Sequence, residues 1–329
     1  MRSLIGTAII AGLVLCPAAV GAAETVIRFS HVVSEETPKG QAALRFKQLV
    51  EQRLAGKVAV EVFPNGKLMD DEHVVRGLLD GTVQIAAPSL SLLEPYTKAY
   101  QVFDLPFLLG STEAVERFEK SAAGEQLLSA MHGQGIEGLC FLHGGMKQLS
   151  ADTPLRLPQD AKGKTFRIQP SSVLVAQFEA LSAVPVKAPF TKVLHMLQSK
   201  GVNGQENTWS NIYSQEFYQA QPFITETNHG SLEYAFIVAR DFWNAFPEDV
   251  RAGLTSAASE ACAYGNSIAA DLNAGDRRKI IQSGYTQVIE LTPQQRAAWV
   301  AVMKPVWSQF EGDIGKDIME AALAAAGAS

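Results

Sequence analysis

One arginine and one asparagine carry the most specific chemical signal in this chain. Arg167 ends a short β-like run, KTFRI, and Asn207 stands forty residues later in the polar run GQENTW. A guanidinium is a permanently charged, forked donor that binds a carboxylate through two parallel hydrogen bonds. The two residues therefore indicate recognition of a small anion. A solvated surface ion pair is the alternative interpretation of Arg167.

The segments of the first half of the chain predict an α/β fold. Short apolar runs alternate with amphipathic stretches at 26–30, 37–54, 57–63, 70–81 and 83–87. This order predicts a mainly parallel sheet covered by helices. Ligands of such sheets bind at the carboxyl ends of strands, which makes His31 and Ser89 candidate pocket residues. A structural histidine and a turn serine are the respective alternatives.

A second set of elements begins near Lys147 and leads into one long helix. The expected strands lie at 164–168, 184–188, 222–228 and 232–239, and the expected helices lie at 171–181 and just before Gly201. A helical pattern then runs from 247 to 283, which corresponds to roughly 50 Å. This length predicts a helix that spans two lobes, with hinges at 144–147 and 230–235. We expect lobe I to comprise 24–145 and 233–272, and lobe II to comprise 146–232 and 273–329.

The first 23 residues are typical of a signal peptide. Arg2 precedes an apolar run at 4–15 and a small-residue zone at 20–23. We therefore expect a periplasmic protein whose mature chain has no stable membrane insertion. The formal net charge of −6 argues against nucleic acid and anionic membranes as partners.

Sequence motifs for catalysis and metal binding are missing. The chain has no GxSxG, HExxH or paired CxxC motif, and its six histidines lack metal-ligand spacing. We therefore predict no enzymatic activity, no metal and no cofactor. Cys140 and Cys262 could pair in an exported chain, but their apolar contexts favour two small buried residues. Asp70 and Asp71 are interpreted as a helix cap. Lys39, at a helix start after Pro38, is interpreted as a surface residue, with an anion contact as the weaker alternative.

Several segments resemble the extracytoplasmic solute-binding proteins of TRAP transporters, in particular the DctP-type, C4-dicarboxylate branch. They are FSHVVSEETPKG, VFPNGKLMDDEHVVRGLLDGTVQIA, GGMKQLSADTPL, the stretch 163–211 and TNHG. The resemblance implies two α/β lobes that close over a ligand, joined by hinge strands and a long helix. It assigns the ligand carboxylate to Arg167, the orienting amide to Asn207 and an aromatic wall to Phe190.

Further positions resemble the dicarboxylate branch of the same family. They are Lys147 followed by Gln148, and Trp209 and Asn211 in the run NTWSN. We expect Lys147 to bind the second carboxylate of the ligand.

The resemblance thus implies delivery of succinate, fumarate or malate to TRAP membrane permease subunits. A 2-oxo acid, aromatic acid or sugar acid on the same fold is an alternative. An exported enzyme acting on a small carboxylic acid and a ligand-sensing partner of a receptor are alternatives of another class.

Overall fold

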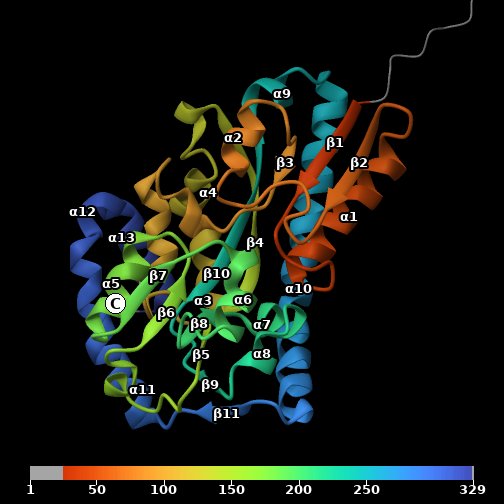
Figure 1. Ribbon diagram of the computed structural model, residues 1–329. Helices are drawn as coiled ribbons and strands as arrows, with labels where there is room; N and C mark the ends of the chain where they lie inside the picture. Colours follow the sequence, from red (N-terminus) through yellow and green to blue (C-terminus); the bar gives the residue numbers. More distant parts are fainter. Residues whose placement is uncertain (1–24, 328–329) are drawn as a thin grey trace, which may run out of the picture.

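The structure, a computed structural model, describes residues 25–327. The predicted signal peptide, residues 1–23, lies outside the described residues. The described chain forms two lobes, each built on its own β-sheet with helices packed around it (Figure 1). The two-lobed α/β architecture expected from the sequence is confirmed.

The first sheet forms the centre of lobe I and has the strand order β2-β1-β3-β10-β4. Its strands are β1 (Thr25–Ser30), β2 (Val58–Phe63), β3 (Ile85–Ala86), β4 (Ile136–Met146) and β10 (Ser231–Ala239). β1 pairs in parallel with β2 and β3, whereas β10 is antiparallel to β3 and β4. The predicted parallel arrangement is correct for the first three strands and wrong for the others. The reason is that β4 leaves lobe I and β10 returns to it.

The second sheet forms the centre of lobe II and has the order β11-β9-β5-β8-β6-β7. Its strands are β5 (Gln148–Ala151), β6 (Thr165–Ile168), β7 (Val184–Lys187), β8 (Gly204–Asn207), β9 (Phe223–Glu226) and β11 (Gln287–Glu290). β6 and β8 are parallel neighbours, with Arg167 opposite Gln205. The carboxyl ends of these two strands therefore bring Arg167 and Asn207 to one edge of the sheet.

Side-chain caps define where the helices that flank the site begin. Thr37 caps α1 by accepting a hydrogen bond from the Gly40 N–H at 3.2 Å, and Ser171 caps α5 in the same way. Both starts agree with the predicted ones. The helices are α1 (Pro38–Arg53), α2 (Val74–Leu79), α3 (Thr112–Glu119), α4 (Ala122–Leu127), α5 (Ser172–Ala180), α6 (Val193–Gln198), α7 (Trp209–Ser214), α8 (Phe217–Ala220), α9 (Arg240–Asn244), α10 (Glu248–Ser283), α11 (Pro293–Met303), α12 (Glu311–Ile314) and α13 (Lys316–Ala326).

Two connections between strands cross from one sheet to the other. The first lies at the predicted hinge, 144–147, and the second lies at 227–230, which meets the predicted hinge at 230–235 only at its edge. Only Lys147 separates β4 in the first sheet from β5 in the second. Gly145 has a φ of +116°, and a Cβ there would lie 2.6 Å from Asn273 Nδ2 of α10, so this position requires glycine. Asn273 also donates to the Gly144 carbonyl and accepts from the Ser210 N–H. One side chain of α10 thus holds the crossing strand and the start of α7.

Helix α10 is 36 residues long and runs beside both lobes (Figure 1), as predicted. It packs against α1 and β4 in lobe I and against α7 in lobe II. A disulfide joins Cys140 of β4 to Cys262 of α10. Our interpretation of these cysteines as two separate buried residues is therefore wrong, because the packing of α10 on β4 brings them together. Between residues 25 and 327, no helix combines the length and apolarity needed to cross a bilayer.

The C-terminal segment departs from the predicted division into lobes. Trp299 and Met303 of α11 belong to the apolar core around β6, in lobe II. Beyond them, Phe310, Met319 and Ala322 belong to a core that also contains residues of α3 and β10, and α13 packs against α3. The chain therefore returns to lobe I at its end.

Candidate functional site

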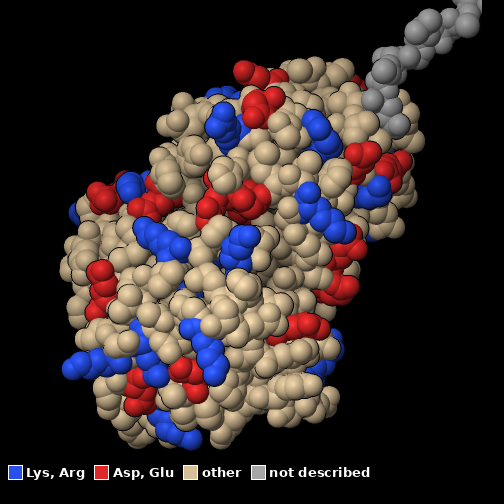
Figure 2. All heavy atoms as spheres, viewed as in Figure 1, with Lys and Arg blue, Asp and Glu red and all other residues tan. Residues whose placement is uncertain are grey.

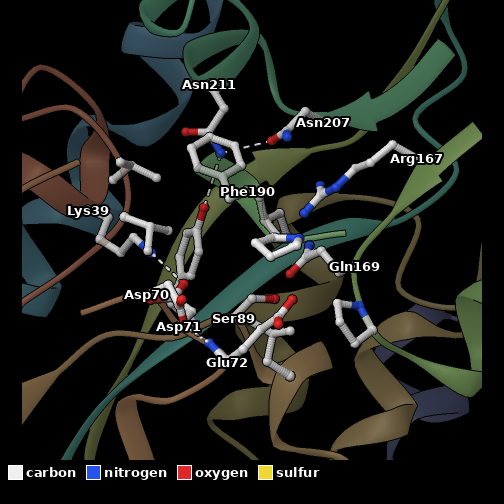
Figure 3. Close-up of a pocket in the computed structure, with 17 residues that line it drawn as sticks. Lys39, Asp70, Asp71, Glu72, Ser89, Arg167, Gln169, Phe190, Asn207 and Asn211 are labelled. Atoms are coloured by element: carbon white, nitrogen blue, oxygen red, sulfur yellow. Dashed lines mark hydrogen bonds and ion pairs between the residues drawn. The ribbon is translucent and has the colours of Figure 1, made fainter. Parts of the chain in front are cut away.

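A pocket lies between the two lobes, and residues of both sheets line it (Figure 3). Its lining residues are Val32, Val33, Lys39, Asp70, Asp71, Glu72, Ser89, Leu92, Leu232 and Tyr234 from lobe I, and Arg167, Gln169, Pro170, Pro189, Phe190, Asn207 and Asn211 from lobe II. The lobes also touch elsewhere, since Gln215 Nε2 donates to Asn65 Oδ1 at 3.3 Å. The pocket is thus enclosed by two bodies that meet around it.

Arg167 reaches the pocket from β6 with a fixed guanidinium. The side chain is only 2% exposed, and its Nε donates to the Ala188 carbonyl at 2.9 Å. This bond leaves the terminal amino groups directed toward the cavity (Figure 3). Burial lowers the pKa of Arg167 to about 10, with Glu206 and Glu72 opposing that effect. The guanidinium is therefore still charged at neutral pH and can bind an anion as a fork.

Asn207 stands at the end of β8, with its amide oriented by the next helix. Asn207 Oδ1 accepts from Asn211 Nδ2 at 2.8 Å and from the Thr208 N–H at 3.1 Å. Because the oxygen is occupied, the amide NH₂ group is the part available to a ligand. Asn211 Nδ2 also lies 3.2 Å from the Tyr234 hydroxyl, which connects lobe II to β10. The resulting donor set is suited to a carboxylate.

Lys39 is a pocket residue, and our expectation of a surface position is wrong. Lys39 lies in the first turn of α1, its side chain is 1% exposed, and its Nζ donates to the carbonyl of Ala87, the residue after β3, at 2.8 Å. Nζ also lies 3.7 Å from Asp71 Oδ2 and 3.8 Å from the centre of the Tyr234 ring. Burial lowers the pKa of Lys39, and Asp71 opposes this shift.

The acidic pair before α2 divides into two different roles. Asp70 Oδ1 accepts from the N–H groups of Glu72 and His73, each at 3.1 Å, in the turn that leads into the helix. Asp71 does not cap the helix, contrary to our interpretation, because its side chain is buried beside Lys39. Burial raises the pKa of Asp71, while Lys39 opposes that effect.

The remaining predicted lining residues are an alcohol and an aromatic ring. Ser89 is buried, and its hydroxyl lies 3.3 Å from that of Ser91. Phe190, in the turn Phe190–Lys192, packs against Phe217 with ring centres 5.7 Å apart. Both side chains line the pocket, one with a hydroxyl group that donates to Ser91 in this structure and one as an apolar wall.

Comparison with known proteins assigns the family. The chain matches DctP, described as bacterial extracellular solute-binding protein, family 7, over residues 29–313. This protein belongs to that family.

Relatives of this family-7 protein agree with the resemblance to the TRAP-type, DctP-like branch. It is 55% identical over 303 residues to the C4-dicarboxylate-binding periplasmic protein DctP of Shewanella loihica, covering 92% of this chain and 90% of that protein. A TRAP periplasmic solute-binding protein of Shewanella oneidensis, crystallised with bound succinate, has 52% identity and a TM-score of 0.91, covering 92% of this chain and all of that one. A TRAP periplasmic solute-binding protein of Pseudomonas aeruginosa, crystallised with bound L-malate, has 46% identity and a TM-score of 0.85. The match covers 87% of this chain and 99% of that one.

Two of the predicted site residues of this solute-binding protein, Lys147 and Gln148, lie outside the pocket lining. Lys147 does not line it, because its Nζ bonds Glu206 Oε1 at 3.0 Å. Gln148 Nε2 donates to the Met146 carbonyl and to Asn228 Oδ1. Both side chains are 1% exposed, and their polar atoms are used within the protein.

The other two residues outside the lining set are His31 and Trp209. His31 is fully buried against Phe29, and its ring nitrogens have no partner among the described residues. Burial, reinforced by Lys39, lowers the pKa of His31 to about 3, so its imidazole is neutral. Trp209 faces a groove beside the hinge, where the Arg277 guanidinium lies 5.7 Å from its ring.

Twelve of the 17 lining residues of this family-7 protein were absent from the predicted site, and four of them, Gln169, Tyr234, Lys39 and Asp71, carry polar groups that the proposed chemistry uses or borders. Gln169 follows Arg167 by two positions, so strand alternation could have placed it on the same face. Tyr234 likewise alternates with Leu232 along β10. Lys39 and Asp71 carry no comparable local signal, because their burial depends on contacts between distant segments, such as those of Lys39 Nζ with the Ala87 carbonyl and with Asp71 Oδ2.

A cluster of ionisable groups lies at the hinge, outside the pocket. His143 Nδ1 lies 2.7 Å from Glu233 Oε2, and His143 Nε2 lies 3.7 Å from Glu119 Oε2. The three side chains could supply ligands to a metal ion. However, each ring nitrogen of His143 faces a different carboxylate, and both nitrogens carry a proton to donate only when the imidazole is protonated. Burial acts against protonation of His143, and Glu233 and Glu119 outweigh it, so the pKa rises to about 9.

Basic and acidic side chains are interspersed over the face of the molecule shown in Figure 2. The cationic groups that could bind a small anion are instead inside the cleft. Arg167 and Lys39 are among the largest fully buried or nearly buried side chains of the described chain. Recognition by buried cations suits a compact acid that the lobes can surround.

Proposed function

We propose that this protein is the periplasmic solute-binding component of a TRAP-type transporter and that it captures a C4-dicarboxylate. The observation that carries the proposal is the presence of two buried cations, Arg167 and Lys39, in one cavity. A dicarboxylate presents one negative charge at each end and matches such a pair. The relatives crystallised with succinate and L-malate, at 52% and 46% identity, support this ligand class.

In this proposal the two ends of the ligand are bound differently. Arg167 takes one carboxylate as a fork, and the Asn207 amide donates to the same group. Lys39 takes the second carboxylate as a point charge, with the hydroxyl groups of Tyr234 and Ser89 as further donors. We had predicted that Lys147 binds the second carboxylate; in this proposal Lys39 binds it instead, because Lys147 is already paired with Glu206.

The contacts of this binding mode are sufficient for micromolar affinity. Hydrogen bonds to charged groups contribute about 1.5–3 kcal/mol each, and micromolar binding corresponds to about −8 kcal/mol. Closure of the lobes excludes water from the cleft, which strengthens these bonds and leaves a surplus after the ordering costs. The closed form then delivers the ligand to the membrane permease subunits.

Export to the periplasm is part of the proposal. Residues 1–23 act as the cleaved signal peptide. The Cys140–Cys262 disulfide supports an oxidising compartment, where such bonds persist.

Isothermal titration calorimetry on the protein purified from periplasm tests the ligand class. We expect binding of succinate, fumarate and L-malate, and weaker binding of butyrate, which has the same length and a single carboxylate. Tighter binding of a 2-oxo acid, an aromatic acid or a sugar acid would replace the dicarboxylate assignment. Proton NMR of the recovered ligand separates binding from catalysis, because an enzyme would return a changed molecule.

A further inference from the structure

Asp71 is a buried carboxylate in the wall of the binding cavity. Its side chain is 7% exposed, and its Oδ1 has no hydrogen-bond partner among the described residues. Its Oδ2 lies 3.7 Å from Lys39 Nζ, whose short hydrogen bond of 2.8 Å goes to the Ala87 carbonyl instead. Asp71 therefore lines the cavity beside Lys39 (Figure 3) with one oxygen that has no partner.

A carboxylate at this position conflicts with the binding of a dianion. The fully or nearly buried charged groups that line the cavity are Lys39, Arg167 and Asp71, which together carry a net charge of +1. Asp70 is one-third exposed and Glu72 is exposed, so solvent screens both. A bound dianion would change the buried charge to −1. An uncompensated buried charge is costly, and a buried group usually changes its protonation state instead.

The other groups that face Asp71 cannot remove this charge. Lys39, from α1, is already a cation, and the buried hydroxyl of Tyr234, from β10, is already protonated because burial raises its pKa. His31, from β1, lies beside Lys39 but does not line the cavity. A proton that enters the cavity with the ligand must therefore settle on Asp71 or on the ligand.

The surroundings of Asp71 favour the protonated form once the ligand is bound. In the structure, burial and the neighbouring Asp70 raise the pKa of Asp71, whereas Lys39 and the Ser89 N–H lower it. A ligand carboxylate at Lys39 would compete for the ammonium group and add a second negative charge next to Asp71. Two carboxylates that share one site cannot both ionise easily, so one of them holds a proton.

We propose that Asp71 takes up one proton when a C4-dicarboxylate dianion binds, and that its carboxyl group then donates a hydrogen bond to the ligand carboxylate beside Lys39. The proton comes from solvent, and no covalent bond changes. This inference rests on the proposed function of the cavity. It makes Asp71 a specificity-determining residue, because a monocarboxylate held by Arg167 alone leaves the charge balance intact and needs no proton.

Calorimetry in several buffers counts the protons directly. Titrations with succinate at about pH 7.5, in buffers of different ionisation enthalpy, should give an uptake of about one proton per ligand. The dissociation constant should rise with pH by up to about tenfold per unit. Asp71→Asn keeps the shape of the side chain and should bind succinate without proton uptake and with little dependence on pH. Asp271→Asn, at an exposed position of α10, should behave as the unmodified protein.

The possible outcomes distinguish failure of this inference from failure of the proposed function. Binding of succinate by the unmodified protein without proton uptake would overturn the role of Asp71 and leave the dicarboxylate function standing. Equal uptake in Asp71→Asn would do the same. A requirement for a metal cation, found by repeating the titration in choline buffer, would replace the proton by that cation. No binding of any diacid would overturn the proposed function and this inference with it. Should Asp71→Asn fail to fold, the buffer series on the unmodified protein decides alone.

Discussion

Lys147 and Glu206 form a buried ion pair outside the pocket lining, with Nζ and Oε1 3.0 Å apart. The other oxygen of Glu206 lies 2.7 Å from His229 Nε2. Lys147 lies between β4 and β5, in one of the segments that cross between the sheets, and Glu206 directly precedes Asn207 on β8. Burial disfavours ionisation of Glu206, but Lys147 and His229 outweigh it, and the pKa of Glu206 falls to about 2. The pair thus holds the crossing segment against the strand that carries the ligand amide.

Replacement of Lys147 tests this structural role. Lys147→Met should lower the free energy of unfolding by roughly 3–5 kcal/mol, because Glu206 would remain buried without its cation. Urea unfolding measures the change, with Lys162→Met at an exposed position of the same lobe as the control. Loss of succinate affinity at unchanged stability would instead support the direct ligand contact that we predicted from the sequence.

Replacement of Arg167 tests the carboxylate fork. Arg167→Lys keeps a positive charge but cannot form two parallel hydrogen bonds, so the affinity for succinate should fall roughly 10- to 150-fold, the equivalent of 1.5–3 kcal/mol. Calorimetry measures the loss. Arg156→Lys, on an exposed turn of the same lobe, serves as the matched control. Unchanged affinity in Arg167→Lys would remove Arg167 from the site.

Replacement of Lys39 tests how the second carboxylate is bound. The double variant Lys39→Met/Asp71→Asn removes both buried charges at that end of the cavity and avoids leaving a lone carboxylate. The affinity for succinate should fall about tenfold or more, whereas butyrate, held by Arg167, should lose much less. Equal losses for the two ligands would show that Lys39 does not distinguish a diacid from a monoacid.

The His143 cluster predicts a decline of stability at alkaline pH. The pKa of His143 rises from 6.5 to about 9 on folding. The native state therefore binds this proton more tightly than the unfolded state, and the stabilisation is complete below pH 6.5 and disappears as the pH rises toward 9. Urea unfolding across this range should show the decline, and His143→Gln should flatten it. His195→Gln, at an exposed position, is the control and should show the same pH dependence of stability as the unmodified protein. If the stability of His143→Gln declined equally with pH, the effect would belong to other groups.

The disulfide predicts a redox-dependent stability. Cys140 and Cys262 are separated by 122 residues. A disulfide that closes a loop lowers the entropy of the unfolded chain and thereby raises the free energy of unfolding by about 2–4 kcal/mol. Cys140→Ala/Cys262→Ala should therefore melt at a lower temperature than the oxidised protein. Addition of a reductant should lower the melting temperature of the unmodified protein only. Succinate affinity should be retained, since both cysteines lie outside the cavity lining.

The sequence by itself determined the elements of this protein and one end of its site. Thr37 and Ser171 mark helix starts by local capping, and the period-2 alternation of β1 and β2 depends on neighbouring residues alone. Arg167 and Asn207 follow the same logic, because strand ends and adjacent polar runs are local patterns. The family resemblance rested on these segments, and the family match over residues 29–313 agrees with it.

Only the tertiary structure decided which other side chains meet at the cavity. Lys147, the lysine expected in the site, is paired with Glu206. Lys39, the lysine expected at the surface, is buried against the Ala87 carbonyl and the ring of Tyr234 on β10. The direction of β10, the Cys140–Cys262 bond and the burial of Asp71 likewise arise from contacts between distant segments. The amino-acid sequence shows which charged side chains the protein contains. Packing decides whether another residue neutralises each charge or leaves it open to a ligand.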